Sequence, residues 1–212
     1  TIPGTDRADE EILLGGHYDS VYFSTGVYDN AAGCVVLMEL MRYFKANPPR
    51  RTLKFVFFGS EEQGLLGSKH YAASHDLEKT VFMVNADVGG PVLGANKAYL
   101  TCNQDGVAYV AALLNEGGYA FEVKQSIQSS DSIPMTDAGV PCLNINRAAA
   151  HGAGGMHSRL DTVSFLSARG VANILYPALD IMKRLDGASV FPIKREIPQE
   201  VRDMVDRYLY RK

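Results

Sequence analysis

The sequence predicts a three-layer α/β/α fold in which a mostly parallel, mixed sheet carries helices on both faces. Short apolar runs typical of buried strands alternate along the chain with stretches of helical composition. Several apolar runs end directly in a charged residue, as strands do when they deliver side chains to the carboxyl edge of an open sheet. With 212 residues, 46% of them hydrophobic, the chain can form one domain with a substantial core. We therefore expect a single domain over residues 1–212.

Six runs have the composition of strands. They are short, rich in apolar residues, and bounded by glycine, proline or polar clusters. After a polar lead at 1–10, they cover residues 11–16, 53–58, 80–86, 97–102, 120–124 and 141–145. Because helical segments separate most of these runs, most neighbouring strands are expected to be parallel.

The intervening segments have helical composition. We expect helices at 31–41, 65–74, 105–116 and 166–185, one helical turn at 134–139, and an amphipathic tail at 198–210 that packs on the domain. Pro48 and Pro49 end the first helix, because proline lacks the amide donor that a helix interior needs. Asp161 and Thr162 are expected to cap the long helix at 166–185. A loop rich in small residues, at 146–157, is of the kind that lines a pocket.

Charge and composition exclude several classes of function. A net charge of -3 without a basic run argues against nucleic-acid binding. No stretch approaches the ~20 apolar residues of a membrane span, and the N-terminus lacks the layout of a signal peptide. The cysteines Cys34, Cys102 and Cys142 are far apart and odd in number, so neither a disulfide framework nor a paired-cysteine metal site is indicated. The oligomeric state is not readable from the sequence.

The pair Glu61 and Glu62 follows the strand at 53–58 almost at once. Two neighbouring glutamates point in different directions from one backbone, which favours a metal ligand beside a proton carrier. The alternative is a solvated first helical turn that complements the helix dipole. His17 and Asp19 likewise follow the first strand, either as a metal ligand with its orienting carboxylate or as surface residues of a turn.

Taken together, the acids and histidines form a set. A parallel sheet would gather them at one edge, because each lies at a strand end or in the loop after it. They are His17, Asp29, Glu61, Glu62, Asp87 and His157. Taken singly, Asp29 could be only a helix cap and Asp87 only a turn residue. Two histidines and three carboxylates are ligands that Zn²⁺ accepts, enough for two ions that share one carboxylate, and one acid remains to act as a base.

Five motifs in this order resemble those of the di-zinc exopeptidase family. That family contains bacterial leucyl aminopeptidases, glutamate carboxypeptidases and the related glutaminyl cyclases. The motifs are GHYDS at 16–20, YDNAAG at 28–33, SEEQGLLGS at 60–68, NAD at 85–87 and HSRLDT at 157–162. The resemblance covers residues 11–185 and implies hydrolysis of a terminal peptide bond by a hydroxide that bridges two zinc ions.

The resemblance also implies a role for each residue of the set. Asp29 would bridge the two ions; His17 and Asp87 would complete one site, and Glu62 and His157 the other. Glu61 would be the general base that takes a proton from water and returns it to the leaving amine. Asp19 would orient His17, Asp161 would do the same for His157, and Asp131 would lie in the substrate loop.

Two positions depart from the family pattern. The residue before the last histidine is often aromatic in the family, and a tyrosine there can steady the oxyanion, but this chain has Met156. The usual Ser-Asp-His of the substrate loop reads Ser130-Asp131-Ser132. Relatives usually carry a helix and one or two strands before the first motif, which favours a fragment of a longer chain.

The resemblance leaves several functions open. An aminopeptidase acting on peptide substrates is favoured, and a secreted or cell-envelope location is slightly favoured. A carboxypeptidase would need a cation for the terminal carboxylate of its substrate, and Arg147 beside the small-residue loop could supply it. A glutaminyl cyclase shares the scaffold but is generally described with one zinc. A receptor-like domain that has lost its metals would be expected to lack ligands, and none is missing here.

Overall fold

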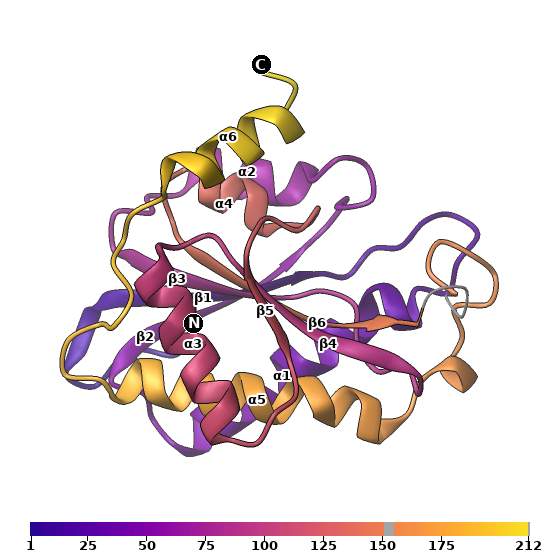
Figure 1. Ribbon diagram of the computed structural model, residues 1–212, viewed down its shortest axis with the longest axis horizontal. Coiled ribbons are helices and arrows are strands. Elements are labelled where there is room, and N and C mark those ends of the chain that lie inside the picture. Colours follow the sequence, from indigo (N-terminus) through magenta and orange to yellow (C-terminus); the bar gives the residue numbers. More distant parts are fainter. Residues whose placement is uncertain (151–154, 212) are drawn as a thin grey trace.

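A computed structural model describes residues 1–150 and 155–211. Its centre is a six-stranded sheet in the order β2-β1-β3-β6-β4-β5 (Figure 1). The strands are β1 (Arg7–His17), β2 (Arg51–Phe58), β3 (Thr80–Ala86), β4 (Gly94–Leu100), β5 (Glu122–Gln125) and β6 (Cys142–Ala149). Neighbouring strands are parallel except for β4 and β6, which pair antiparallel. The mostly parallel, mixed sheet predicted from the sequence is confirmed.

Helices cover both faces of the sheet and complete the three layers (Figure 1). One layer contains α1 (Ala32–Ala46), α3 (Gln104–Glu116) and α5 (Ala168–Gly187), and the other contains α2 (Leu66–Ser74), α4 (Ser132–Asp137) and α6 (Gln199–Tyr208). Two short turns, η1 (Val27–Ala31) and η2 (Val163–Phe165), precede α1 and α5. Among the described residues, none of the helices combines the length and hydropathy that a membrane span needs.

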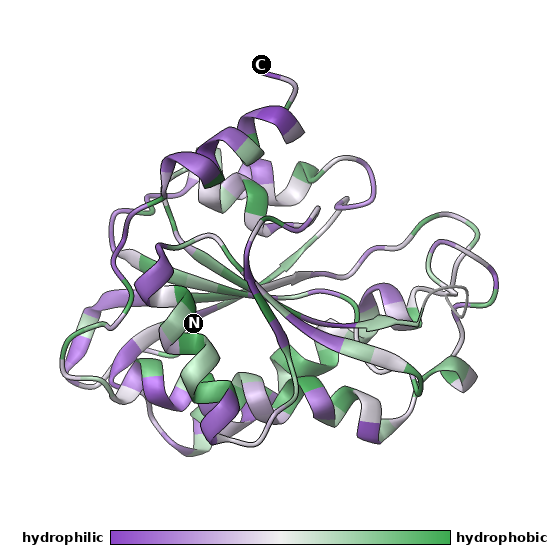
Figure 2. Cartoon of the chain, in the orientation of Figure 1, coloured by the Kyte–Doolittle hydropathy of each residue, from purple (hydrophilic) through white to green (hydrophobic). Residues whose placement is uncertain are grey.

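Alternate residues of the central strands face opposite layers. Ile12 and Leu14 pack among apolar residues of α1 and α5, whereas Leu13 between them packs among apolar residues of α2 and α4. All three side chains are fully buried, as expected for a central parallel strand with helices on both sides. Figure 2 shows the central strands as mainly hydrophobic and α6 as mainly hydrophilic. This rigid double core holds the strand ends, and the loops that follow them, in fixed positions.

The largest differences from the predicted strand boundaries are at the start of β1 and the end of β6. β1 begins at Arg7, inside the segment interpreted as a polar lead, because Arg7 pairs in register with Arg51 of β2. β6 continues to Ala149 rather than ending at Ile145, because β4 runs antiparallel beside it as far as the pairing of Gly94 with Ala149. The predicted loop at 146–157 is therefore partly strand, and its residues 151–154 lie outside the described part of the chain.

The predicted cap of the long helix is wrong. α5 begins at Ala168, and the hydroxyl of Ser167 accepts a 2.9 Å hydrogen bond from the Gly170 amide. The η2 turn separates Asp161 from this helix, so its carboxylate cannot reach the helical amides. The Asp161 carboxylate instead accepts hydrogen bonds from the loop that carries Asp29.

Arg51 is a fully buried charge that joins the start of β2 to the end of α5. Its guanidinium lies 2.6 Å from Glu10 and donates to three carbonyls at the C-terminal end of α5. Arg51→Met keeps an apolar stem but leaves these acceptors unpaired, so we expect the free energy of unfolding to fall by about 3–5 kcal/mol. Urea denaturation measures the loss, with the exposed Arg42→Met as control. A loss below about 1 kcal/mol, typical of a surface ion pair, would contradict the prediction.

Candidate metal and catalytic site

The predicted acids and histidines come from separate segments that meet at the carboxyl edge of the sheet. All six line one cavity of about 450 Å³. They are His17 at the end of β1, Asp29 in η1, Glu61 and Glu62 after β2, Asp87 after β3 and His157 after β6. The chain leaves β1 toward β2 on one side and leaves the neighbouring β3 toward β4 on the other side, and open α/β sheets usually hold their sites where connections diverge in this way.

Asp29 lies at the centre of the cluster and contacts both histidines. Its Oδ1 is 3.1 Å from His17 Nε2, and its Oδ2 is 3.1 Å from His157 Nε2. On the outer sides, His17 Nε2 is 3.3 Å from Asp87 Oδ1, and His157 Nε2 is 3.0 Å from Glu62 Oε2. One carboxylate therefore stands between two histidine–carboxylate pairs, with one oxygen directed to each.

The side chains divide into two groups that could each hold a metal ion. One contains His17, Glu61 and Asp87; the other contains Asp29, Glu62 and His157. In each group one ligand atom per residue lies within 4.8 Å of the others. The structure thus places His17 and Asp87 in one group and Glu62 and His157 in the other, the same division between two ions that the resemblance implies. It also brings Glu61 close to the first pair, which the sequence did not indicate.

Burial and crowding of like charges raise the pKa values of the two glutamates in the cavity. Burial raises the pKa of Glu61 to about 8, with repulsion from Asp87 adding to it and His17 opposing it. Burial and the neighbouring Asp29 also raise the pKa of Glu62. Burial alone would lower the pKa of His17, but hydrogen bonds to Asp29 and Asp87 outweigh it and raise this pKa to about 12. The site concentrates negative charge that a cation would stabilise.

Left-handed backbone conformations cluster around this cavity. Ser60 and Leu65, on either side of the glutamate pair, have φ values of 57° and 62°. Val88 and His157, at two other walls, have φ values of 58° and 52°. Residues with a Cβ atom adopt this region at a cost in free energy, and such strain is found preferentially at functional sites.

Asp19 fixes the glutamate loop as well as His17. Its backbone oxygen lies 3.1 Å from His17 Nδ1, and its Oδ1 lies 3.6 Å from the same nitrogen. The same carboxylate accepts hydrogen bonds from the backbone amides of Glu61, at 3.0 Å, and Glu62, at 3.3 Å. Asp19 therefore links the loop after β1 to the loop after β2, a contact that the sequence did not predict.

Asp161 holds the backbone around Asp29. It is fully buried, and its carboxylate accepts hydrogen bonds from the amides of Tyr28, at 2.6 Å, and Asp29, at 3.2 Å. Ser24 Oγ donates a third hydrogen bond, at 3.3 Å. The resemblance implied that Asp161 orients His157, whereas these hydrogen bonds orient the segment that carries Asp29.

Asn30 is a positioning residue that sequence reasoning missed. Its side-chain nitrogen donates to the carbonyl oxygens of Ala86 and His17, and its Oδ1 accepts from the amides of Gly33 and Val88. A Cβ atom at Gly33 would lie 2.3 Å from Ala86 O and from Asn30 Oδ1, so only glycine fits beside it. That glycine, three residues after the asparagine, was the available sequence signal of a close approach.

We expect Asn30→Ala to lower the free energy of unfolding by about 1–3 kcal/mol, because it leaves buried backbone groups without partners. It should also weaken metal binding about 10- to 100-fold, the range seen when groups that orient metal ligands are removed. Thermal unfolding and a metal titration measure the two effects. Asn47→Ala, at an exposed helix end, is the control. Unchanged metal affinity in a folded Asn30→Ala protein would contradict the positioning role.

Two other predicted residues lie away from the cavity lining. Arg147 donates to the carbonyls of Pro91 and Val92 and to Asn96 Oδ1, so its guanidinium braces the segments at β4. Asp131 is fully buried, and neither of its carboxylate oxygens lies in hydrogen-bond geometry with a protein donor. Burial raises the pKa of Asp131 to about 7, although Ser68 and His17 lower it. Neither residue belongs to the lining of the cavity.

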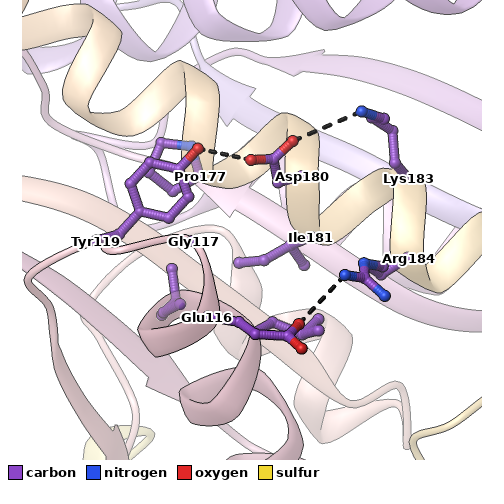
Figure 3. A pocket seen from close by; sticks show the side chains of 10 residues that line it. Glu116, Gly117, Tyr119, Pro177, Asp180, Ile181, Lys183 and Arg184 are labelled. Carbon is purple, nitrogen blue, oxygen red and sulfur yellow. Dashed lines mark hydrogen bonds and ion pairs between the residues drawn. The ribbon is translucent and has the colours of Figure 1, made fainter.

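A second hollow, of about 420 Å³, lies between α3 and α5. Figure 3 shows that its charged groups are paired with one another. Tyr119 donates to Asp180 at 2.6 Å, Lys183 lies 3.7 Å from the same carboxylate, and Arg184 pairs with Glu116 at 3.2 Å. Because these groups satisfy one another rather than converge on the hollow, the acidic cavity is the better candidate site.

Comparisons with known proteins agree with this choice. The family model of peptidase family M28 matches residues 1–182. Aminopeptidase YwaD of Bacillus subtilis is 29% identical over 159 residues, which are 67% of this chain and 33% of that protein. A probable zinc metalloprotease of Pyrenophora tritici-repentis is 35% identical over 100 residues, 42% of this chain and 23% of that protein. The chain thus spans a third or less of these curated relatives.

Solved structures give the same result for the fold. BSAP, a zinc aminopeptidase from Bacillus subtilis, superposes with a TM-score of 0.72 at 25% identity, covering 89% of this chain and 50% of that one. A glutaminyl cyclase from an Acidobacteriales bacterium superposes with a TM-score of 0.74 at 21% identity, covering 88% and 72%. The second likeness concerns the fold alone. With the family match over most of its length, the chain belongs to peptidase family M28.

Proposed function

We propose that this chain is the catalytic unit of a zinc-dependent exopeptidase, an aminopeptidase that uses two zinc ions. The observation that carries the proposal is Asp29, whose two oxygens face His17 and His157 at 3.1 Å each. A carboxylate in that position suits two ions bound side by side. The zinc aminopeptidase BSAP and the aminopeptidase YwaD, both from Bacillus subtilis, support the choice of metal and reaction.

The residues present fit such ions. Asp29 and Asp87 are each 5% exposed, and Glu62 Oε1 is buried without a hydrogen-bond partner. The residues that line the cavity include no lysine or arginine in the described chain, so the two histidines are the only cationic partners that the described lining offers the carboxylates. Carboxylate oxygens and imidazole nitrogens are ligands that Zn²⁺ accepts. His17 and Asp87 would hold one ion, Glu62 and His157 the other, and Asp29 both.

When bound, the zinc ions would make a water molecule more acidic and polarise the scissile carbonyl group. Glu61 would accept the proton of the attacking water and pass it to the leaving amine. Its pKa of about 8 reflects protein groups alone. Neighbouring cations would lower the pKa of Glu61 toward neutral pH, and a general base works best when its pKa is close to the working pH. Asp19, through the Glu61 amide, would keep this carboxylate in place during the transfer.

The charges of the cavity favour an aminopeptidase over a carboxypeptidase. A substrate ammonium group is attracted by the acidic lining, whereas a terminal carboxylate would need a cation. Arg147 was the candidate cation, but its donors are engaged by Pro91, Val92 and Asn96, outside the lining. A free N-terminus is therefore the substrate end that the site fits.

The test combines metal analysis with two blocked peptides. The chain, purified without chelator, should contain two zinc ions and release leucine from leucyl-p-nitroanilide until a chelator removes the metal. It should also cleave Leu-Gly-Gly-amide but not N-acetyl-Leu-Gly-Gly, because acetylation removes the ammonium group. The reverse preference would indicate a carboxypeptidase. Absence of bound metal after loading with zinc would overturn the enzymatic proposal.

A further inference from the structure

We propose that Tyr208, on the C-terminal helix α6, is a specificity-determining residue that forms one wall of the substrate pocket and selects an uncharged, apolar terminal side chain. The proposal rests on the exopeptidase function proposed above. Tyr208 lines the same cavity as the acids and histidines, although α6 is far in sequence from the strands that carry those residues. The family model ends at residue 182, so α6 lies outside the matched residues.

α6 is firmly attached to the layer that borders the cavity. Val205 is buried and packs with Leu65 and Ile133, and Leu65 itself follows the glutamate loop closely. Beyond the helix, Arg211 makes two hydrogen bonds, at 2.6 and 2.8 Å, with the carboxylate of Asp137 at the end of α4. Apolar packing along the helix and an ion pair beyond its end hold α6 in one position. A side chain on this helix is therefore a fixed part of the wall.

The ring of Tyr208 is oriented by a second contact. Its hydroxyl lies 2.7 Å from Ser129 Oγ, in the loop before α4. Ser129 and its neighbour Gln128 line the cavity too, and Gln128 donates to Asp87 Oδ2 at 3.4 Å. The hydroxyl of Tyr208 is thus engaged at the loop, while the residue packs against the Leu65 cluster and lines the cavity. This arrangement uses both the apolar body and the polar tip of the side chain.

The chemistry of the wall defines the side chain that fits. Tyr208 lines the cavity together with Leu65, Val88 and Met156, while the carboxylates lie at the sheet edge. A substrate residue held by its ammonium group near the carboxylates would place its side chain against these apolar groups. An acidic side chain would be repelled by the carboxylates, and a basic one would bury its charge against apolar groups. A leucine-like side chain fits both requirements.

The test compares Tyr208→Ala with Tyr210→Ala, a tyrosine of the same tail that is 94% exposed and outside this cavity. For leucyl-p-nitroanilide we expect Tyr208→Ala to raise KM about tenfold, the loss of apolar contact with one side chain, with kcat within about twofold. For alanyl-p-nitroanilide, whose side chain is too short to gain from the wall, KM should stay within about twofold. Tyr210→Ala should change neither constant.

Conservative variants test the orientation of the ring. Tyr208→Phe and Ser129→Ala each remove the same hydrogen bond, so their effects on the leucyl KM should match, at about threefold or less, and the double variant should add nothing. Protection of the zinc-loaded protein by free leucine against thermal unfolding gives a readout without turnover. This protection should decrease in Tyr208→Ala and persist in Tyr210→Ala.

The outcomes separate the two proposals. A zinc-loaded parent chain that cleaves neither substrate overturns the exopeptidase function itself. An active parent whose Tyr208→Ala variant keeps the same ratio of leucyl to alanyl kcat/KM overturns the role of Tyr208. Equal losses on both substrates, with lower zinc content, would also overturn it, because they would show that α6 only supports the fold.

Discussion

Replacing Glu61 by glutamine is expected to lower kcat by about 100- to 10,000-fold, the range that a general acid–base contributes, while the protein keeps its zinc. Glutamine has the size of glutamate and leaves the backbone hydrogen bond from the Glu61 amide to Asp19 in place. Its neutral amide cannot accept a proton from the attacking water. Steady-state kinetics on leucyl-p-nitroanilide and zinc content per chain measure the two quantities.

The zinc measurement matters because Glu61, His17 and Asp87 form one of the two candidate metal groups, with ligand atoms within 4.8 Å of one another. A Glu61→Gln protein that loses an ion would make Glu61 a ligand rather than a base. Retained turnover with both ions bound would remove Glu61 from the proton transfer altogether. Glu78→Gln, at an exposed position outside the five motifs and outside the cavity lining, serves as the matched control and should leave both quantities unchanged.

Replacing Asp29 by alanine is expected to abolish high-affinity binding of both ions, weakening zinc affinity more than about 100-fold, beyond what the loss of an orienting group costs. Each of its oxygens faces a different histidine, so one substitution removes a ligand from each site. Isothermal titration calorimetry and zinc analysis measure the loss. Turnover should disappear with the metal.

Because Asp29→Ala removes a buried charge from a cluster of like charges, the variant should remain folded, and circular dichroism checks this. Asp29→Asn keeps the shape and one neutral oxygen donor, and it should retain more zinc than the alanine variant. Asp9→Ala, which changes an exposed aspartate, is the control. A variant without the Asp29 carboxylate that still holds two ions would refute the bridging role.

Much of the site could be predicted because it depends on local patterns. The strands that end at Phe58 and Ala86 are short apolar runs that stop in charge, and parallel packing brings such ends together. The sequence therefore indicated which acids and histidines would share one edge. It did not indicate the hydrogen bonds that position them, because Asp161 and Tyr28 are 133 residues apart and no periodic pattern connects them.

The predictions for Asp161 and Arg147 failed for the same reason, because contacts between segments distant in sequence decide what each side chain binds. Asp161 has the residue type and position of a helix cap. Its buried carboxylate instead accepts hydrogen bonds from the backbone amides of the loop around Asp29. Arg147 looked available as a substrate cation, yet its guanidinium is held by backbone oxygens beside β4. Tyr208 lies in an amphipathic tail, and the sequence predicted that the tail packs but not that it reaches the cavity.

The hydrogen bonds made by Asp19 and Asp161 have a consequence for how the protein folds. Asp19 joins segments 42 residues apart in sequence, and Asp161 joins segments 133 residues apart. Contacts of such long sequence separation form slowly, because closing the intervening loops costs entropy before the contacts can repay it. In refolding, the helices, whose contacts are local, should therefore return before zinc affinity and catalysis. The active site becomes a reporter of the last stage of folding, and partly folded chains should be inactive.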